Sequence, residues 1–418
     1  MSTKKSVVSI VKGTDAQEMV DKAISLLGGV ESFIKPNSVV VIKPNAGHPS
    51  APETSVNTSP AVISAVIKAI RRGKPKEIIM AEASAVGQDT LKAFEVSGIR
   101  KAAEDAGADK IIDIKRLERE DLVDVKVPNS SQISSFSLPK FLLEADCVIG
   151  VPIFKTHLSM VFTGAVKAMK GVVDDKTHRR MHFVDLSEAL FDMLSVIKPS
   201  LSIVDMIRPQ EGLGPMTLGK PVDFGVIVAG TDTLAIDATC CRLTGIDPNK
   251  TYLRKGTKRG LGNIKASLIE IRGNTIKQAF KKLDTSFLAG FARYPEYKIF
   301  DQNSCSSCMG IMAYVFEALK TQGKYEANKG ISVVFGPKKE LPKDAARGKD
   351  LILVGRCVEK FRKEGVYVGG CPPLAFQPVF AILKREDQEE EQAPIDAWKK
   401  PEGEDWLRAT EKKPNAGK

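Results

Sequence analysis

Four cysteines in the last third of the chain have the residue type and spacing of metal ligands. Cys305 and Cys308 are three positions apart, and Cys357 and Cys371 follow at longer intervals. Two thiolates three positions apart on a turn can bind one metal centre, and two later thiolates complete the four-cysteine set that a 4Fe-4S cluster requires. Pro372 follows the last cysteine, as in the Cys-Pro ending of bacterial ferredoxin motifs. The pattern therefore predicts a 4Fe-4S cluster as the metal cofactor.

Two other uses of these cysteines are weaker alternatives. A structural zinc site accepts four thiolates, but its second ligand pair usually repeats a short spacing, whereas Cys357 and Cys371 are fourteen residues apart. A redox-active dithiol needs only Cys305 and Cys308 and leaves the two later cysteines without a role. Cys147, Cys240 and Cys241 lie in apolar segments and are expected to be core thiols.

Lysines and histidines before position 183 form a second candidate site. Lys155 and His157 are two positions apart, so an extended backbone would place both on one face. Lys167 and Lys170 share one face of a predicted helix. Lysine binds phosphate or carboxylate as a point charge, and histidine can move a proton near neutral pH. The candidate residues are Lys155, His157 and His182 for catalysis, and Lys43, Asn45, Lys167, Lys170, Asp205 and Asp232 for anion binding. A solvated basic surface is the simpler alternative.

His178 and His182 are four positions apart, a spacing that would suit a metal site on a helix. No glutamate lies between them, and the helix signal over residues 174–180 is weak. We therefore expect this pair to donate hydrogen bonds or transfer protons.

Apolar runs that end at polar residues recur along the first part of the chain. The runs at 39–42, 78–81, 147–154, 201–204 and 226–230 are followed by Lys43, Glu82, Lys155, Asp205 and Asp232. Helix-like stretches alternate with them, which predicts an α/β fold with a mostly parallel sheet and flanking helices. Because ligands bind at the carboxyl ends of parallel strands, these polar residues predict a shared cleft. Ser59 and Pro60 have the types of a helix N-cap and first helical residue.

The expected organisation is an α/β domain over residues 1–275, a smaller C-terminal α/β iron-sulfur module over 276–384, and a charged, disordered tail over 385–418. In the module, strands are expected at 331–335, 351–354 and 366–368. The strands before Cys357 and Cys371 would place both cysteines at one edge of a second sheet.

Composition excludes several classes of protein. No run approaches the roughly 18 to 20 apolar residues of a membrane span, and the chain is expected to be cytoplasmic without membrane partners. The net charge of +11 favours an anionic partner, but the basic residues are not gathered with aromatic ones, so nucleic acid is not expected. Neither a dinucleotide-binding fingerprint nor a phosphate-binding loop is present. A flavin therefore has no motif to support it.

Several segments together resemble the iron-sulfur protein family known as domain of unknown function 362. They span about residues 38–273 and include Lys43-Pro44-Asn45, Thr58-Ser59-Pro60, Lys155-Thr156-His157, Lys167 to Gly171, His182, Asp205, Gly214-Pro215, and Asp232 with Asp237. The resemblance implies a cluster-associated redox protein with no settled reaction. Gly370-Cys371-Pro372-Pro373 is also similar to a ligand segment in iron-sulfur subunits of respiratory complex I and nickel-iron hydrogenases. Many members carry Cys-x-x-Cys-x-x-Cys, whereas Cys308 has no third cysteine nearby.

The expected function is an iron-sulfur oxidoreductase in which the cluster exchanges electrons with an anionic small molecule. A ferredoxin-like redox partner and a homo-oligomer are compatible with this expectation. One alternative is a proton-transfer or metal-cofactor handling enzyme with a structural cluster; its lysine and histidine pattern is similar, by analogy, to that of nickel-pincer lactate racemases. Another is an electron carrier without catalytic activity.

Overall fold

The computed structural model describes residues 5–157, 160–182, 184–215, 218–301, 304, 306–370, 373 and 376–384. They form two compact units. The first consists of the described residues up to Arg293 and those within 302–314, and the second of Tyr294–Asp301 and the described residues from Val315 onward. Each unit has its own main sheet.

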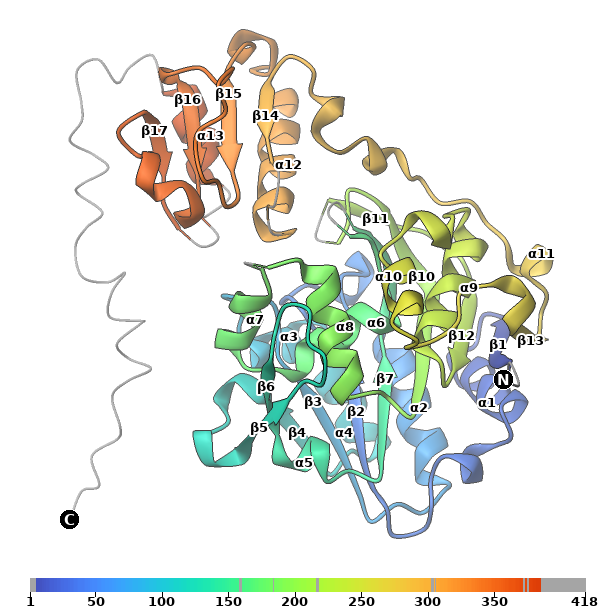
Figure 1. The fold of residues 1–418 in the computed structure, drawn as a ribbon. Coiled ribbons are helices and arrows are strands. Elements are labelled where there is room, and N and C mark those ends of the chain that lie inside the picture. The colour runs from blue at the N-terminus through green and yellow to red at the C-terminus, as the bar shows by residue number, and fades with distance from the viewer. Residues whose placement is uncertain are drawn as a thin grey trace, which may run out of the picture. The chain divides into compact units, whose positions relative to one another are not determined.

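A mostly parallel sheet runs through the first unit (Figure 1). Among the described residues it has eleven strands, with the main path β13-β1-β12-β10-β7-β2-β3-β4. β11 and β8 pair with β10, and β9 pairs with β8. The bounds are β1 Ser6–Lys12, β2 Val39–Pro44, β3 Glu77–Glu82, β4 Lys110–Asp113, β7 Cys147–Val151, β8 Ile153–His157, β9 Val161–Thr163, β10 Leu201–Gly212, β11 Gly219–Pro221, β12 Val226–Gly230 and β13 Ile269–Gly273. A separate hairpin pairs β5 (Leu122–Lys126) with β6 (Ser135–Pro139).

Helices cover both faces of this sheet, and the strand residues alternate between two hydrophobic cores. In β2, Val40 and Ile42 pack with α1, α2 and α4, whereas Val41 packs with α6, α8 and α9. The alternation is the two-residue period of a strand, and burial on both faces explains why the strands are apolar throughout. The predicted α/β fold is confirmed. The helices are α1 Ala16–Leu26, α2 Pro60–Arg71, α3 Thr90–Val96, α4 Ile99–Ala106, α5 Lys140–Leu143, α6 Ala165–Ala168, α7 Asp175–His182, α8 Leu186–Val196, α9 Thr233–Thr244, α10 Leu253–Lys258 and α11 Ile276–Ala279. No helix within the described ranges is long and apolar enough to span a membrane.

One strand runs against its neighbours. β12 is antiparallel to both β1 and β10, whereas β10, β7, β2, β3 and β4 are mutually parallel. The carboxyl end of β12 therefore lies at the opposite edge from those of β2 and β3. Asp232 follows β12, so the expectation that it joins the shared edge is wrong. Its carboxylate instead caps α9 by accepting the N–H groups of Leu234 and Ala235, and it also bonds Ser6 and Asn263.

β10 is longer than the sequence indicates, because it continues past Asp205 to Gly212. Asp205 is buried inside the strand, where its Oδ2 accepts the Ser59 N–H at 2.9 Å and its Oδ1 accepts the Ile207 N–H at 3.0 Å. Burial raises the pKa of Asp205, and these two hydrogen bonds oppose the rise. Asp205 thus binds the backbone N–H of Ser59, the residue just before α2, and Ser59 at the N-cap with Pro60 at the first helical position agrees with the prediction.

The second unit contains a four-stranded parallel sheet in the order β14-β15-β16-β17. The bounds are β14 Lys298–Phe300, β15 Ser332–Phe335, β16 Gly348–Val354 and β17 Gly365–Val368, and the helices that follow β14 and β17 are α12 Ser306–Thr321 and α13 Phe376–Leu383. Val334, Leu351, Leu353 and Val358 form its core. The three strands predicted in this region are therefore confirmed.

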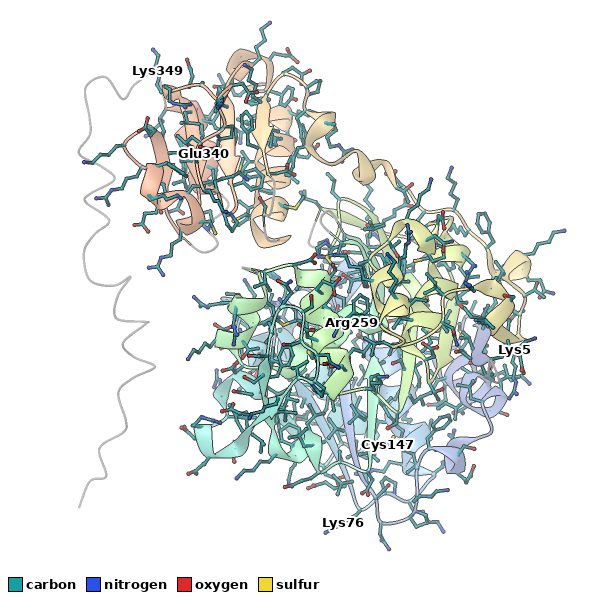
Figure 2. The ribbon with its side chains drawn as sticks, in the orientation of Figure 1. Lys5, Lys76, Cys147, Arg259, Glu340 and Lys349 are labelled. Carbon is teal, nitrogen blue, oxygen red and sulfur yellow. The ribbon has the colours of Figure 1, made fainter. Side chains whose placement is uncertain are left out.

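The three cysteines expected in the core of the first unit are buried there. Cys147, in β7 (Figure 2), is 1% exposed, and Cys240 and Cys241, in α9, are fully buried. Burial raises the pKa of each thiol, so all three are neutral and unreactive at physiological pH.

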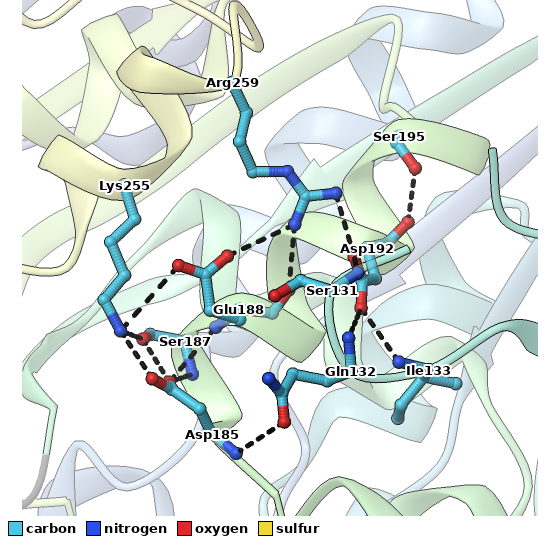
Figure 3. Close-up of polar contacts among 10 residues, drawn as sticks. All are labelled: Ser131, Gln132, Ile133, Asp185, Ser187, Glu188, Asp192, Ser195, Lys255 and Arg259. Carbon is cyan, nitrogen blue, oxygen red and sulfur yellow. Dashed lines mark hydrogen bonds and ion pairs between the residues drawn. The ribbon is translucent and has the colours of Figure 1, made fainter. Parts of the chain in front are cut away.

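A buried carboxylate in α8 joins three segments of the first unit (Figure 3). Asp192 accepts the backbone N–H groups of Ser131, Gln132 and Ile133 at 2.7–2.9 Å, and Arg259 Nη2 lies 2.8 Å away. Burial alone would raise the pKa of Asp192, but these hydrogen bonds and the guanidinium together lower it. The charged form is therefore stabilised in the folded state.

We expect Asp192→Asn to lower the free energy of unfolding by about 3 kcal/mol. The substitution removes the carboxylate partner of Arg259, and it places an amide NH₂ group among backbone N–H donors that need an acceptor. Urea unfolding measures this. Asp185→Asn is the control, since its exposed pair with Lys255 contributes at most about 1 kcal/mol. Because the folded pKa of Asp192 is lowered, its contribution should be lost as the pH falls below about 4. Equal effects of the two variants would contradict this account.

Candidate functional site

A buried ion pair links the carboxyl ends of two neighbouring strands. Lys43 in β2 places its Nζ 2.8 Å from Glu82 Oε2 at the end of β3, and both side chains are 2% exposed. Lys43 Nζ also donates to the Pro44 carbonyl at 2.8 Å. The Glu82 carboxylate accepts the N–H groups of Ala46 and Ala83. Burial raises the pKa of Glu82, although Lys43 and these donors favour the charged form.

The ion pair leaves no room for a side chain at Gly171. A Cβ there would lie 1.8 Å from Glu82 Oε1 and 2.6 Å from Lys43 Nζ. Gly171 also accepts the Ala83 N–H at 2.8 Å through its carbonyl. The turn that follows α6 is thereby packed directly against the ends of β2 and β3.

Lys155 reaches the same region from β8. Its Nζ donates to Asn45 Oδ1 at 2.8 Å and to the Val56 carbonyl at 2.5 Å. The loop that carries Asn45 is fixed by Thr58, whose hydroxyl accepts the Asn45 N–H and donates to the Val151 carbonyl. Burial, and then repulsion from Lys167, lower the pKa of Lys155 to about 7. Lys155 can therefore exist with or without its proton near neutral pH.

Lys167 is the third lysine and comes from α6. Asp237 in α9 caps this short helix by accepting the N–H groups of Ala165 and Val166 at 2.6 and 3.0 Å. Burial, and then repulsion from Lys43, lower the pKa of Lys167 to about 8. Its side chain is partly exposed, and its ammonium forms no hydrogen bond or ion pair with any residue that the structure describes. Lys167 can therefore donate to a ligand.

We call Lys43, Glu82, Lys155 and Lys167 the lysine cluster. Three ammonium groups from β2, β8 and α6 interact electrostatically, and Glu82 is the carboxylate paired with one of them. With every group charged, the cluster carries an excess of positive charge in a largely buried place. Such an arrangement is costly unless an anion or the loss of protons reduces the charge.

The β8–β9 hairpin adds two polar side chains beside Lys155. The prediction that Lys155 and His157 share one face is confirmed, because both lie in β8 at alternate positions. His157 is 1% exposed, and its Nδ1 accepts the Met160 N–H at 3.3 Å, which leaves the proton of the neutral ring on Nε2. Thr163 lies opposite Lys155 in the ladder, so its side chain leaves the hairpin on the same face. Its hydroxyl is buried and has no hydrogen-bond partner among the described residues.

The other predicted site residues are placed differently. Lys170 is buried in the turn that follows α6, next to Gly171. Asp205 binds the backbone N–H groups of Ser59 and Ile207, whereas Asp232 caps α9 at the far edge of the sheet. His178 and His182 lie in α7, so the expectation of weak helicity over residues 174–180 is wrong; the Asp174 carboxylate accepts the Thr177 N–H at the start of this helix.

Two members of this region were not among the predicted site residues. Glu82 is the last residue of β3 and ends an apolar run, as Lys43 does in the neighbouring β2, and this parallel placement is the signal in the sequence that could have identified it. His48 lies in the loop after β2, where its Nδ1 is 2.9 Å from Ser50 Oγ. Burial chiefly lowers the pKa of His48, and the charge of Lys155 lowers it further. This coupling places His48 close to the lysine cluster.

Two of the four cysteines predicted to bind a 4Fe-4S cluster belong to the described part of the chain. Cys308 is buried in α12, and Cys357 follows β16. Cys305 and Cys371 lie outside the described residues. Among the residues that are described, no three His, Cys, Asp or Glu side chains gather in a metal-binding group. β16 and β17 are neighbours, and the Arg356 N–H donates to the Gly370 carbonyl at 2.9 Å, so the residues just before Cys357 and Cys371 are joined at one edge.

Residues 40–242 match the family model described as Domain of unknown function (DUF362). The resemblance seen in the sequence is confirmed for this range, which contains the whole lysine cluster. Thylakoid-associated protein sll1697 of Synechocystis sp. is 29% identical over 236 residues, which cover 53% of this chain and 68% of that protein. The family description names no activity, so function has to be inferred from the geometry.

Two solved structures have limited similarity to the chain. One is a crystal structure of a Thermotoga maritima protein, with 14% identity, a TM-score of 0.36 and coverage of 53% of this chain. The other is the lactate racemase apoprotein of Thermoanaerobacterium thermosaccharolyticum, with 12% identity, a TM-score of 0.36 and coverage of 62% of this chain. The match spans 57% of the length of each solved chain.

We expect Gly171→Ala to lower the free energy of unfolding by about 1–3 kcal/mol, because the added methyl group must push the Lys43–Glu82 pair apart. Chemical unfolding monitored by circular dichroism measures the loss. Gly310→Ala in α12 is the matched control: a Cβ there meets no atom within 4 Å, so this variant should be neutral or more stable by up to about 1 kcal/mol. A Gly171→Ala protein as stable as wild type would show that the ion pair is not tightly packed.

Proposed function

We propose that the first unit binds an anionic small molecule at the lysine cluster and exchanges a proton with it. The observation that carries this proposal is a cluster of three lysines in which one is paired with a carboxylate and another, Lys167, has no hydrogen-bond or ion-pair partner among the described residues. Lysine ammonium groups bind carboxylates and phosphates as point charges. The ligand expected here is therefore a small carboxylate, phosphate or similar oxyanion.

The hydrogen-bonding capacity of the cluster supports the same ligand. An ammonium group has three N–H donors. Lys43 donates to Pro44 and Glu82, and Lys155 donates to Asn45 and Val56, so each retains donor capacity. Lys167 adds an ammonium without a described partner. An oxyanion would accept hydrogen bonds from several directions and would offset the excess positive charge.

Lys155 is the group best suited to move the proton. Its pKa of about 7 matches the requirement that a general acid or base be poised near the operating pH. Asn45 and Val56 fix the position of its Nζ, so proton transfer would occur at a defined place. His157, on the same face of β8, is the second candidate for this role.

We further propose that Cys305, Cys308, Cys357 and Cys371 bind a 4Fe-4S cluster and that the protein is an oxidoreductase. The adjoining ends of β16 and β17 support the assignment of Cys357 and Cys371, because each cysteine follows the end of one of these strands. A bound cluster would supply single electrons. A proton-transfer enzyme with a structural cluster is the second candidate, and the poised Lys155 favours it.

We expect Lys167→Met to weaken anion binding by about 10- to 100-fold, the value of a lost hydrogen bond to a charged group. Isothermal titration calorimetry with sulfate and acetate measures the change. Lys176→Met is the control, since Lys176 is an exposed lysine of α7 and its loss removes the same charge. Equal affinities of the two variants would mean that only overall charge attracts the anion.

We expect protein isolated without oxygen to contain about four iron and four sulfide per chain. Cys357→Ser should lower both contents, whereas Cys147→Ala, which changes a core thiol, should leave them unchanged. Iron and acid-labile sulfide assays make the comparison. A colourless protein with one zinc per chain would rule out the redox proposal and leave the anion site untouched.

A further inference from the structure

The charge balance of the lysine cluster has a consequence for how it binds a ligand. Lys43 is neutralised by Glu82 at 2.8 Å, whereas the bonds of Lys155 within the described residues go to an amide oxygen and a carbonyl oxygen. Lys167 forms no hydrogen bond or ion pair within the described part of the chain. Two of the three ammonium groups therefore lack a bonded counter-charge.

Charged and titratable groups lie on each of the elements that carry or surround the cluster. They are Lys43 on β2, His48 in the following loop, Glu82 on β3, Lys155 and His157 on β8, Lys167 on α6, Lys170 in the following turn, Asp205 on β10 and Asp237 on α9. Asp237 accepts the N–H groups of Ala165 and Val166 in α6, and Asp205 accepts those of Ser59 and Ile207. Burial raises the pKa of Asp237 to about 7, so this carboxyl titrates in the same pH range as Lys155. Within this described set, Glu82 is the carboxylate bonded to a lysine of the cluster, whereas Asp205 and Asp237 are bonded to backbone N–H groups.

Without an anion, the protein can reduce the excess charge by losing protons. Burial and mutual repulsion lower the pKa of Lys155 to about 7 and that of Lys167 to about 8. A bound anion opposes both effects, because its charge favours the protonated amines. Thr163 points to where such a ligand would lie: its buried hydroxyl faces the same side as Lys155 and has no partner among the described residues.

We propose that the lysine cluster takes up protons from solvent when it binds its anion, so that the ligand is held by Lys155 and Lys167 in their charged forms. This inference rests on the proposed anion-binding function and adds a coupling between the two processes. No covalent bond forms or breaks. Protons move from solvent to the amines, and the positive charge that they add balances the negative charge of the ligand.

The direction of the pH dependence follows from linkage. Below the pKa values of the unliganded amines, both are already protonated, and the anion binds with full affinity and without proton uptake. Above them, each amine must gain a proton on binding, so affinity falls by up to about tenfold per pH unit for each amine. The fall ends where the pH exceeds the pKa values of the liganded state.

Isothermal titration calorimetry with sulfate and formate on the full chain tests the inference. Neither ion titrates between about pH 6 and pH 8.5, so any proton taken up in that interval enters the protein. Repeating each titration in buffers of different ionisation enthalpy gives the number of protons bound. We expect almost none at about pH 6, and at about pH 8.5 roughly one or more per anion together with an affinity at least tenfold weaker.

Lys167→Arg keeps the positive charge at this position but removes the titration of the amine. Arginine remains charged throughout this interval, so the variant should still bind the anion but should take up fewer protons at the higher pH. Lys68→Arg, at an exposed position of α2, is the control and should match wild type. Thermal unfolding verifies that both variants are folded.

The outcomes are distinct. Anion binding with the same affinity and no proton uptake at both pH values would overturn the coupling and leave the proposed function intact. Unchanged uptake in Lys167→Arg would also overturn the part assigned to Lys167. Absence of binding at either pH would reject the anion site itself, and the inference with it.

Discussion

The buried ion pair between Lys43 and Glu82 is the interaction on which the candidate site depends. It joins β2 to β3 at their carboxyl ends, and the turn at Gly171 packs directly against it. Glu82 also accepts the Ala46 N–H, which holds the loop whose Asn45 bonds to Lys155. Taking two charges out of water is costly, and the backbone N–H groups of Ala46 and Ala83 offset part of that cost. The pair therefore both holds the elements of the site together and sets its charge.

This arrangement separates the tasks of the three lysines. Lys43 is neutralised and holds the strands together, Lys155 is held in place by uncharged acceptors, and Lys167 keeps an ammonium available. Three lysines of the same chemical type thus differ through their partners alone. In the proposed function, anion binding and proton exchange would be carried by different side chains of one cluster.

The sequence was sufficient for the features that depend on local pattern. Apolar runs located the strands, Ser59 and Pro60 marked the start of α2, and the two-residue period placed Lys155 and His157 on one face. Strand direction was not predictable, because the five apolar residues of β12 are equally compatible with either orientation. The sequence predicts Asp205 at the end of a strand, whereas the residue lies inside β10 and its carboxylate accepts the N–H of Ser59, just before α2. Such pairings join residues far apart in the chain, and no spacing rule contains them.

Because β12 runs antiparallel to its neighbours, the two edges of the sheet in the first unit differ in how well they would tolerate substitutions. The turn after this strand opens away from the lysine cluster, and there Asp232 connects α9 to Ser6 and Asn263. Substitutions in that turn would affect the stability of the first unit alone. Substitutions near Lys167 would also affect the proposed anion site. Under the proposed function, we expect relatives to vary in sequence and length at the turn after β12 and to keep the residues of the lysine cluster.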